Sequence, residues 1–170
     1  MLSGRVSRVT APEAFLFFMI TDIHYCSRLS AEERLTRENP ARTAVISITD
    51  PGQAPALIHW DGPILRLSFW DGGSTEELGL APNAVAQVVQ FLEHLDAKKE
   101  PYVLVVHCEY GASRSPAVAL YAEALTGADL HRRYLAFGAN RYVLEALIQA
   151  RHLAEAVHVP EGPGAMTLHQ

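Results

Sequence analysis

The segment HCEYGASRS, residues 107–115, holds a cysteine and an arginine separated by five residues, with small residues between them. The apolar run Tyr102–Val106 precedes it and an apolar helical run, 116–120, follows, which predicts a tight loop between a strand and a helix. Backbone N–H groups of such a loop converge on one point, where the helix dipole favours negative charge. In that field Cys108 is expected to be largely thiolate at neutral pH, and Arg114 can hold two oxygens of a tetrahedral oxyanion. The residue types and their spacing therefore predict a nucleophile and an anion site in one loop, as phosphoryl transfer requires.

The other residues of this loop have separable predicted roles. Gly111 is expected to allow a positive φ, so that consecutive N–H groups can converge on one phosphate. Ser115 is placed to hydrogen-bond to the Cys108 sulfur and to help it leave; the alternative is a cap or first-turn serine with no chemical role. The predicted phosphate-binding residues are Glu109, Tyr110, Gly111, Ala112, Ser113 and Arg114.

The loop sequence resembles the signature of the cysteine-based protein tyrosine phosphatase superfamily, His-Cys, five residues, then Arg-Ser or Arg-Thr. Its Gly-Ala-Ser-Arg-Ser ending is most similar to the small dual-specificity branch and its bacterial relatives. The resemblance covers roughly residues 43–157. It implies a phosphomonoesterase that forms a phosphocysteine and uses neither a metal nor a cofactor. It also implies that His107 supports the loop and the thiolate without shuttling protons, although a strand-end histidine could equally be a core residue.

Two loop residues depart from the pattern of these relatives. Tyr110 stands where they usually carry a small residue, and it could narrow or roof the pocket. Glu109 places a carboxylate at the mouth, where lipid phosphatases of the superfamily tend to be basic, so it argues against a polyphosphoinositide substrate. Too few residues precede Cys108 for the inserted recognition loop of the tyrosine-specific branch. A shallow pocket of the dual-specificity kind is therefore expected, unless Tyr110 supplies a wall.

Cleavage of a phosphate ester also needs a proton for the leaving oxygen. The resemblance implies an Asp from a loop three to four dozen residues before the cysteine. Asp71 lies 37 positions before Cys108, just after a predicted strand, and is expected at the same edge of the sheet. Asp61 has a similar Trp-Asp-Gly context but precedes that strand, and Asp96 ends a helix on the wrong side. We predict Asp71 as the acid, against the alternative that it is an ordinary turn residue.

Short apolar runs alternate with amphipathic ones along the chain. This order favours an α/β fold, with a central, mostly parallel β-sheet flanked by helices on both faces. Ligands of such sheets bind beyond the carboxyl ends of the strands, where Cys108 falls. The predicted strands are Ala14–Ile20, Thr43–Ile48, Ile64–Phe69 and Tyr102–Val106. The predicted helices are Ser30–Glu38, Pro82–Leu95, Ser115–Leu125, Leu130–Phe137 and Tyr142–Val157.

Composition sets the remaining expectations. The 170 residues suggest one domain over 1–159 and a flexible tail over 160–170. The net charge of −5, without a Lys/Arg cluster, argues against nucleic acid or a membrane surface as the main partner. Two cysteines make no disulfide framework, and the apolar run Ala14–Ile20 is too short to span a bilayer and lacks signal-peptide features. A cytoplasmic location is therefore expected.

Three further features have weaker predicted roles. The eight histidines show no metal-ligand spacing, so no metal site is predicted. Cys26 could resolve an oxidised Cys108, although a lone second cysteine is more often inert. Asn140 is expected to cap the last helix, and it could also brace the loop.

Together these observations predict a cysteine-dependent phosphatase acting on a phosphorylated protein, at tyrosine or with dual specificity. The alternatives are a catalytically weak phosphate-binding module and a phosphatase of a small, non-protein phosphate ester. A sulfur or arsenate enzyme with a similar loop is disfavoured by the His-Cys start and the serine after Arg114. The sequence does not predict an oligomeric state.

Overall fold

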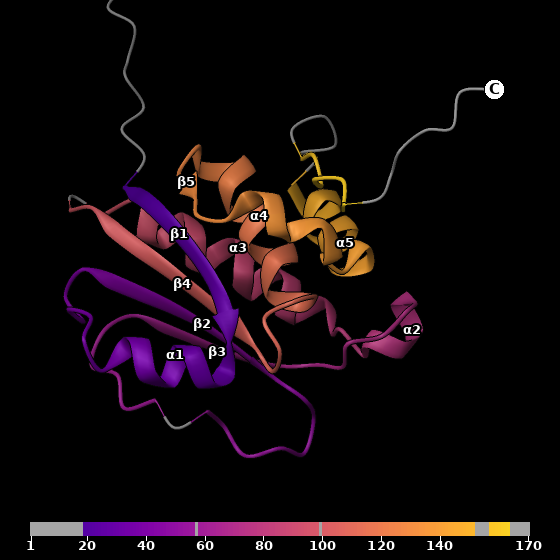
Figure 1. Cartoon of the computed structure of the whole chain (residues 1–170), viewed down its shortest axis with the longest axis horizontal. Coiled ribbons are helices and arrows are strands. Elements are labelled where there is room, and N and C mark those ends of the chain that lie inside the picture. The colour runs from indigo at the N-terminus through magenta and orange to yellow at the C-terminus, as the bar shows by residue number, and fades with distance from the viewer. Residues whose placement is uncertain (1–18, 57, 99, 152–156, 164–170) are drawn as a thin grey trace, which may run out of the picture.

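Five parallel strands form one sheet in the order β3-β2-β4-β1-β5 (Figure 1). The structure is a computed structural model that describes residues 19–56, 58–98, 100–151 and 157–163. The strands are β1 (Ile20–Ser27), β2 (Thr43–Thr49), β3 (Ile64–Ser68), β4 (Tyr102–Cys108) and the short edge strand β5 (Asp129–Leu130).

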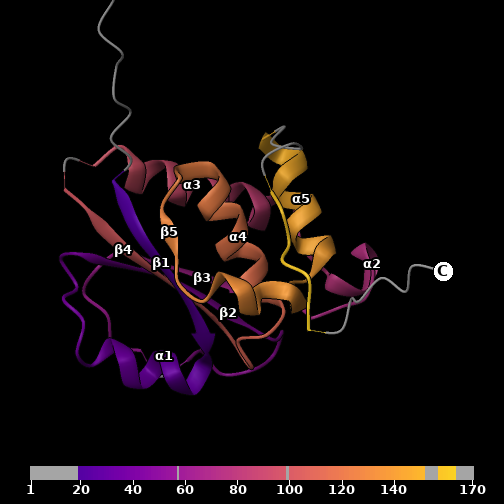
Figure 2. The same cartoon turned by 45° about the horizontal axis from the view of Figure 1, so that its top comes forward.

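Helices cover both faces of this sheet (Figures 1 and 2). On one face lies α1 (Arg28–Leu35), and on the other lie α3 (Pro82–Asp96), α4 (Arg114–Thr126) and α5 (Arg141–Arg151). The short α2 (Thr75–Leu78) and the 3₁₀ helix η1 (Arg133–Gly138) complete the order. The predicted α/β fold with a parallel sheet between helices is confirmed. Among the described residues, no helix has both the length and the apolar character needed to cross a bilayer.

The two strands β2 and β4 have a clear apolar sequence pattern because they are buried. Every residue of β2 is buried, as is β4 from Leu104 to Cys108, because helices lie on both faces. Strands in that position become nearly continuous apolar runs. One apolar cluster lies under α3, α4 and α5, and a smaller one, including Val45 and Val105, lies under α1.

At the β1–β5 edge of the sheet, the sequence did not predict most of β1, and one predicted helix is wrong. Residues 14–18 of the predicted strand Ala14–Ile20 lie outside the described residues, and the observed strand β1 starts at Ile20 and continues to Ser27. The predicted helix Leu130–Phe137 is instead the end of β5 followed by η1. The reason is Arg132, whose φ of 57° is left-handed and prevents an α-helix from continuing through it.

The other predicted helices differ mainly at their ends. The first runs Arg28–Leu35 rather than Ser30–Glu38, since the Ser27 hydroxyl accepts a hydrogen bond from the Ser30 N–H and caps the helix there. The last is described over Arg141–Arg151, and residues 152–156 of its predicted range lie outside the described residues.

The parallel topology separates the acid candidates. The chain leaves β3 and β4 at the same edge of the sheet, which brings the segments holding Asp71 and Cys108 to one side. Asp61 lies before β3 and shares a surface hollow with Tyr102 at the start of β4, so it is at the opposite edge. The Asp96 carboxylate accepts a hydrogen bond from the Met19 N–H just before β1, again at the amino end. The expected placement of the three aspartates is confirmed.

His107 is fully buried between β4 and β2 and should make stability depend on pH. Its Nε2 lies 2.8 Å from the Ser47 hydroxyl, and its Nδ1 has no partner among the described residues. Burial lowers the pKa of His107 from 6.5 to about 4. Between these values the unfolded chain binds a proton that the folded chain does not. His107 therefore leaves the unfolding free energy unchanged above pH 6.5 and lowers it as the pH drops toward 4.

We predict that His107→Gln has a shallower loss of unfolding free energy between pH 6.5 and 4.5 than the wild type. The difference should approach ~1.4 kcal/mol per pH unit, because one proton is removed from the linkage. Urea denaturation at several pH values measures both slopes. Parallel slopes in the two proteins would contradict a buried, neutral His107.

Candidate active site

The thiol of Cys108 lies at the end of β4, at the start of the loop, and is 2% exposed. Its sulfur is 3.2 Å from the hydroxyl oxygen of Ser115, which is fully buried in the first turn of α4. The cap residue of α4 is Ser113, so Ser115 does not have the capping role considered as an alternative. Its hydroxyl is instead positioned to donate to a sulfur anion.

The loop between them, residues 109–113, is pressed against the end of β1. Gly111 has φ 71°, and a Cβ there would overlap the backbone of Cys26 and Ser27, so no side chain fits. The Arg28 N–H donates to the Glu109 carbonyl at 3.2 Å and fixes the start of the loop. The backbone N–H groups of residues 110–113 donate to none of the described residues. They are therefore available to an anion.

The guanidinium of Arg114 has protein partners on one side only. It is 2% exposed, and its Nη1 donates to the Phe69 carbonyl at 2.6 Å and pairs with the Asp50 carboxylate at 2.7 Å. Its Nε is buried, and none of the described residues accepts a hydrogen bond from it. The Nε–Nη2 edge is thus the edge left for a ligand, in the side-on geometry that binds two oxygens of an oxyanion.

Asp50 is not among the site residues predicted from the sequence. It follows β2, and therefore lies at the same edge of the sheet as Asp71 and Cys108. The placement argument that selected Asp71 would have found it as well.

Two side-chain hydrogen bonds hold Asp71, one from the loop and one from Asn140 at the start of α5. Its Oδ1 accepts from the Ser113 hydroxyl at 2.6 Å and from the Asn140 amide at 2.9 Å. The same amide donates to the Gly72 carbonyl, and the Asn140 backbone N–H donates to the Ser113 carbonyl, both at 2.9 Å. The Asn140 side-chain oxygen caps α5 by accepting from the Tyr142 N–H. Asn140 therefore both caps the helix and holds the Asp71 carboxylate against the loop.

The rim residues are placed differently from what was expected. Tyr110 is 83% exposed, so its ring projects from the loop and does not roof the thiol. The Glu109 carboxylate lies 3.8 Å from the Arg28 guanidinium, which offsets its charge. Ala112 is exposed, and Gly138 of η1 lies close to its carbonyl.

Cys26 is not positioned to resolve an oxidised Cys108. It packs against the apolar cluster on the α1 face of the sheet, whereas Cys108 belongs to the cluster on the other face. Burial raises the pKa of the Cys26 thiol to about 11, so it is protonated at neutral pH. The structure favours the inert alternative.

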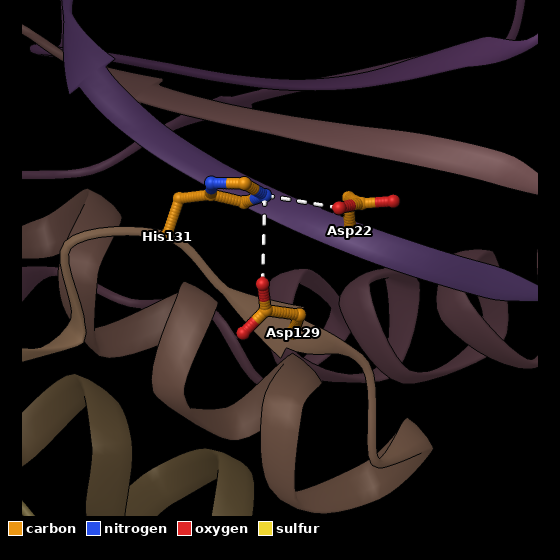
Figure 3. Close-up of side chains that lie close together, drawn as sticks. All are labelled: Asp22, Asp129 and His131. Atoms are coloured by element: carbon orange, nitrogen blue, oxygen red, sulfur yellow. Dashed lines mark hydrogen bonds and ion pairs between the residues drawn. The ribbon is translucent and has the colours of Figure 1, made fainter.

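A second group of charged side chains gathers where β5 joins β1 (Figure 3). The His131 Nε2 lies 2.9 Å from an Asp22 oxygen and 3.7 Å from an Asp129 oxygen, and the three ligand atoms could reach one metal ion. Sequence spacing could not reveal this group, because the strand pairing brings Asp22 next to the other two. The hydrogen bond from His131 lowers the pKa of Asp22. All three side chains are well exposed, which suits an ion-pair clamp that holds β5 to β1.

Comparison with known proteins adds a likeness in overall structure. No family model and no curated protein matches the sequence. A human tyrosine phosphatase-like serine/threonine/tyrosine-interacting protein is 17% identical, with a TM-score of 0.46, over 76% of this chain and 91% of that one. DUSP15 is 18% identical, with a TM-score of 0.44, over 86% and 79% of the two chains. These values are too low to assign a function, which has to come from the residues of the site.

The Asp50–Arg114 pair predicts a specific loss of stability. Asp50→Asn removes the negative charge beside a buried guanidinium and should lower the unfolding free energy by about 1–3 kcal/mol. Inorganic phosphate should restore part of the loss, because the anion supplies the missing charge. Urea denaturation with and without phosphate measures both effects.

Asp61→Asn is the matched control at the opposite edge of the sheet, and it should change stability little. If the two variants were equally stable, the pair would have no structural importance.

Proposed function

We propose that the protein is a cysteine-dependent phosphomonoesterase, a phosphatase of the protein tyrosine phosphatase superfamily, similar to its small dual-specificity and bacterial-type members. The observation that carries this proposal is the buried Arg114, whose Nε has no partner among the described residues. An unsatisfied buried donor is rare unless a ligand satisfies it. Here it lies in the same loop as a thiol and a row of unpaired backbone N–H groups. A tetrahedral dianion fits that donor set.

In the first step, the Cys108 thiolate attacks phosphorus and the bond to the leaving oxygen breaks. The loop N–H groups and Arg114 hold the three equatorial oxygens, over which negative charge is spread in the transition state. Asp71 gives its proton to the leaving oxygen, which departs as an alcohol or a phenol. The products of this step are the free hydroxyl compound and a phosphocysteine.

In the second step, water attacks phosphorus and the sulfur–phosphorus bond breaks. Asp71, now ionised, accepts the proton of the attacking water. Ser115 donates a hydrogen bond to the departing sulfur, consistent with the 3.2 Å distance between the two atoms. Inorganic phosphate leaves, and the thiolate and the protonated acid are restored. Asn140 and Ser113 position Asp71 through both steps.

The proposal also covers the substrate, the location of the protein and the residues that form the phosphatase domain. Phosphotyrosine is favoured over phosphoserine and phosphothreonine because phenoxide leaves more easily than alkoxide, and an exposed Tyr110 leaves the mouth open to all three. A cytoplasmic location suits a free catalytic thiol, which a reducing compartment preserves. The phosphatase domain is proposed to span residues 1–159, followed by a tail.

A phosphate-binding module without turnover is the second candidate. One observation favours it: the Cys108 side chain is only 2% exposed, so access to phosphorus requires the anion to enter deeply. Such a module would use the same loop and Arg114. It would bind phosphorylated proteins and release them unchanged.

The nucleophile is tested with an aryl phosphate substrate. Cys108→Ser should lower kcat by about a thousandfold or more while phosphate still binds, because the loop N–H groups and Arg114 remain. Arg114→Lys should be severely impaired, since an ammonium group cannot make the planar two-point contact. Chelator should leave wild-type activity intact and vanadate should compete. Substantial activity in the Ser variant would exclude the mechanism, and an inactive wild type that binds phosphate would favour the binding module.

The acid is tested through the leaving group. Asp71→Asn should slow the hydrolysis of alkyl phosphates by about a hundredfold and that of nitrophenyl phosphate much less, because a good leaving group needs no proton. Asp61→Asn removes the same charge at the other edge and should match the wild type. A reversed pattern in the two variants would assign the acid to Asp61.

A further inference from the structure

A depression of about 410 Å³ opens beside the phosphate loop. Gly111 and Ala112 of the loop form one wall, and Leu135 and Phe137 of η1 form the other. The end of β1 forms its floor. Because the depression shares its wall with the loop, any ligand in the loop that is longer than a phosphate group can extend into it.

Large apolar side chains are exposed at this depression and on η1 beside it. Four of the large apolar side chains that are well exposed in the described part of the chain belong to the loop or to η1. They are Tyr110, Tyr134, Leu135 and Phe137, with exposed fractions of 83%, 71%, 44% and 46%. A group of exposed apolar side chains next to a polar site is typical of a surface that binds another molecule.

Arg132 adds a positive charge to the same surface. It is the only residue other than glycine, among those the structure describes, that has a positive φ. Its carbonyl accepts hydrogen bonds from the Tyr25 hydroxyl at 2.8 Å and the Leu135 N–H at 2.9 Å, which hold the backbone in place. A left-handed conformation is unfavourable for a residue with a Cβ, whereas glycine adopts it freely.

An arginine side chain therefore occupies a position where a glycine would fold more easily. No carboxylate among the described residues pairs with its guanidinium, whereas neighbouring Arg133 pairs with Glu123. Backbone strain that surrounding hydrogen bonds maintain is concentrated at functional positions. An exposed, unpaired cation beside an anion site indicates a second anionic group on the ligand.

We propose that this depression binds the peptide segment next to the phosphorylated residue of a protein substrate, and that Arg132 pairs with an acidic side chain of that segment. The inference rests on the proposed phosphatase function and names the substrate class: acidic phosphopeptides with an apolar neighbour. A small phosphate ester would contact only the loop and Arg114. It would leave both the apolar rim and Arg132 without a ligand.

The decisive variant is Arg132→Gly, because it removes the charge and suits the backbone conformation. Two phosphotyrosine peptides are compared, one with Asp and Glu beside the phosphotyrosine and one with Asn and Gln. The variant should lose about fivefold in kcat/KM for the acidic peptide only, as expected for a partly exposed ion pair. Its rates with the neutral peptide and with an aryl phosphate should not change. Its thermal stability should equal or exceed that of the wild type, whereas a purely structural Arg132 would lower it.

Two other variants complete the test. Arg42→Ala removes an arginine charge near the amino end of β2, where Arg42 pairs with Glu100, and should keep the preference for the acidic peptide. Phe137→Ala should weaken both peptides equally and leave the aryl phosphate unaffected. The proposal would be overturned if Arg132→Gly still preferred the acidic peptide. It would also be overturned if the wild type did not prefer the acidic peptide.

Fluorescence anisotropy measures the binding of the same peptides to Cys108→Ser. This measurement separates the proposed phosphatase function from the proposed role of Arg132. A wild type inactive on aryl phosphate would refute the phosphatase function alone. The difference in affinity between acidic and neutral peptides, and its loss on Arg132→Gly in the Cys108→Ser background, would still decide the role of Arg132.

Discussion

The guanidinium of Arg114 carries a full charge at a position where water reaches only 2% of the side chain. A buried charge is tolerated when it is paired and hydrogen-bonded, and Asp50 and the Phe69 carbonyl meet that need on one side only. The loops after β2 and β3 must therefore approach α4 closely. The segments that hold Asp50, Phe69 and Cys108 come together around this one cation, and its Nε is left without a partner among the described residues.

Asp71 is held by a second network, made of neutral donors. Ser113 belongs to the loop before α4 and Asn140 to the cap of α5, and both donate to the same oxygen of Asp71. The position of Asp71 is thereby linked to the start of the last helix, far along the chain from Cys108. In the proposed reaction, Arg114 binds the charge of the anion and Asn140 helps to hold the proton donor in place.

The sequence predicted the parts of the fold whose pattern comes from burial. Strands such as β2 and β4 have helices on both faces, so their residues are nearly all apolar and the pattern is clear. β1 was missed because polar side chains at the β5 junction, such as Asp22 and His24, interrupt its apolar pattern. The segment after β5 was misassigned because a left-handed Arg132 has no sequence signal of its own. The sheet-edge position of Asp50 follows from the strand order, but its ion pair with Arg114 has no sequence signal because Arg114 lies in a distant helix.

The only two thiols of the chain, Cys26 and Cys108, lie on opposite faces of the sheet. If Cys108 is oxidised to a sulfenic acid, Cys26 lies behind the backbone of β1 and β4 and offers no high effective concentration of thiol. Repair must then be bimolecular. Its rate follows the concentration of small thiols in the surroundings, so the lifetime of the oxidised protein reports the reducing capacity of its compartment.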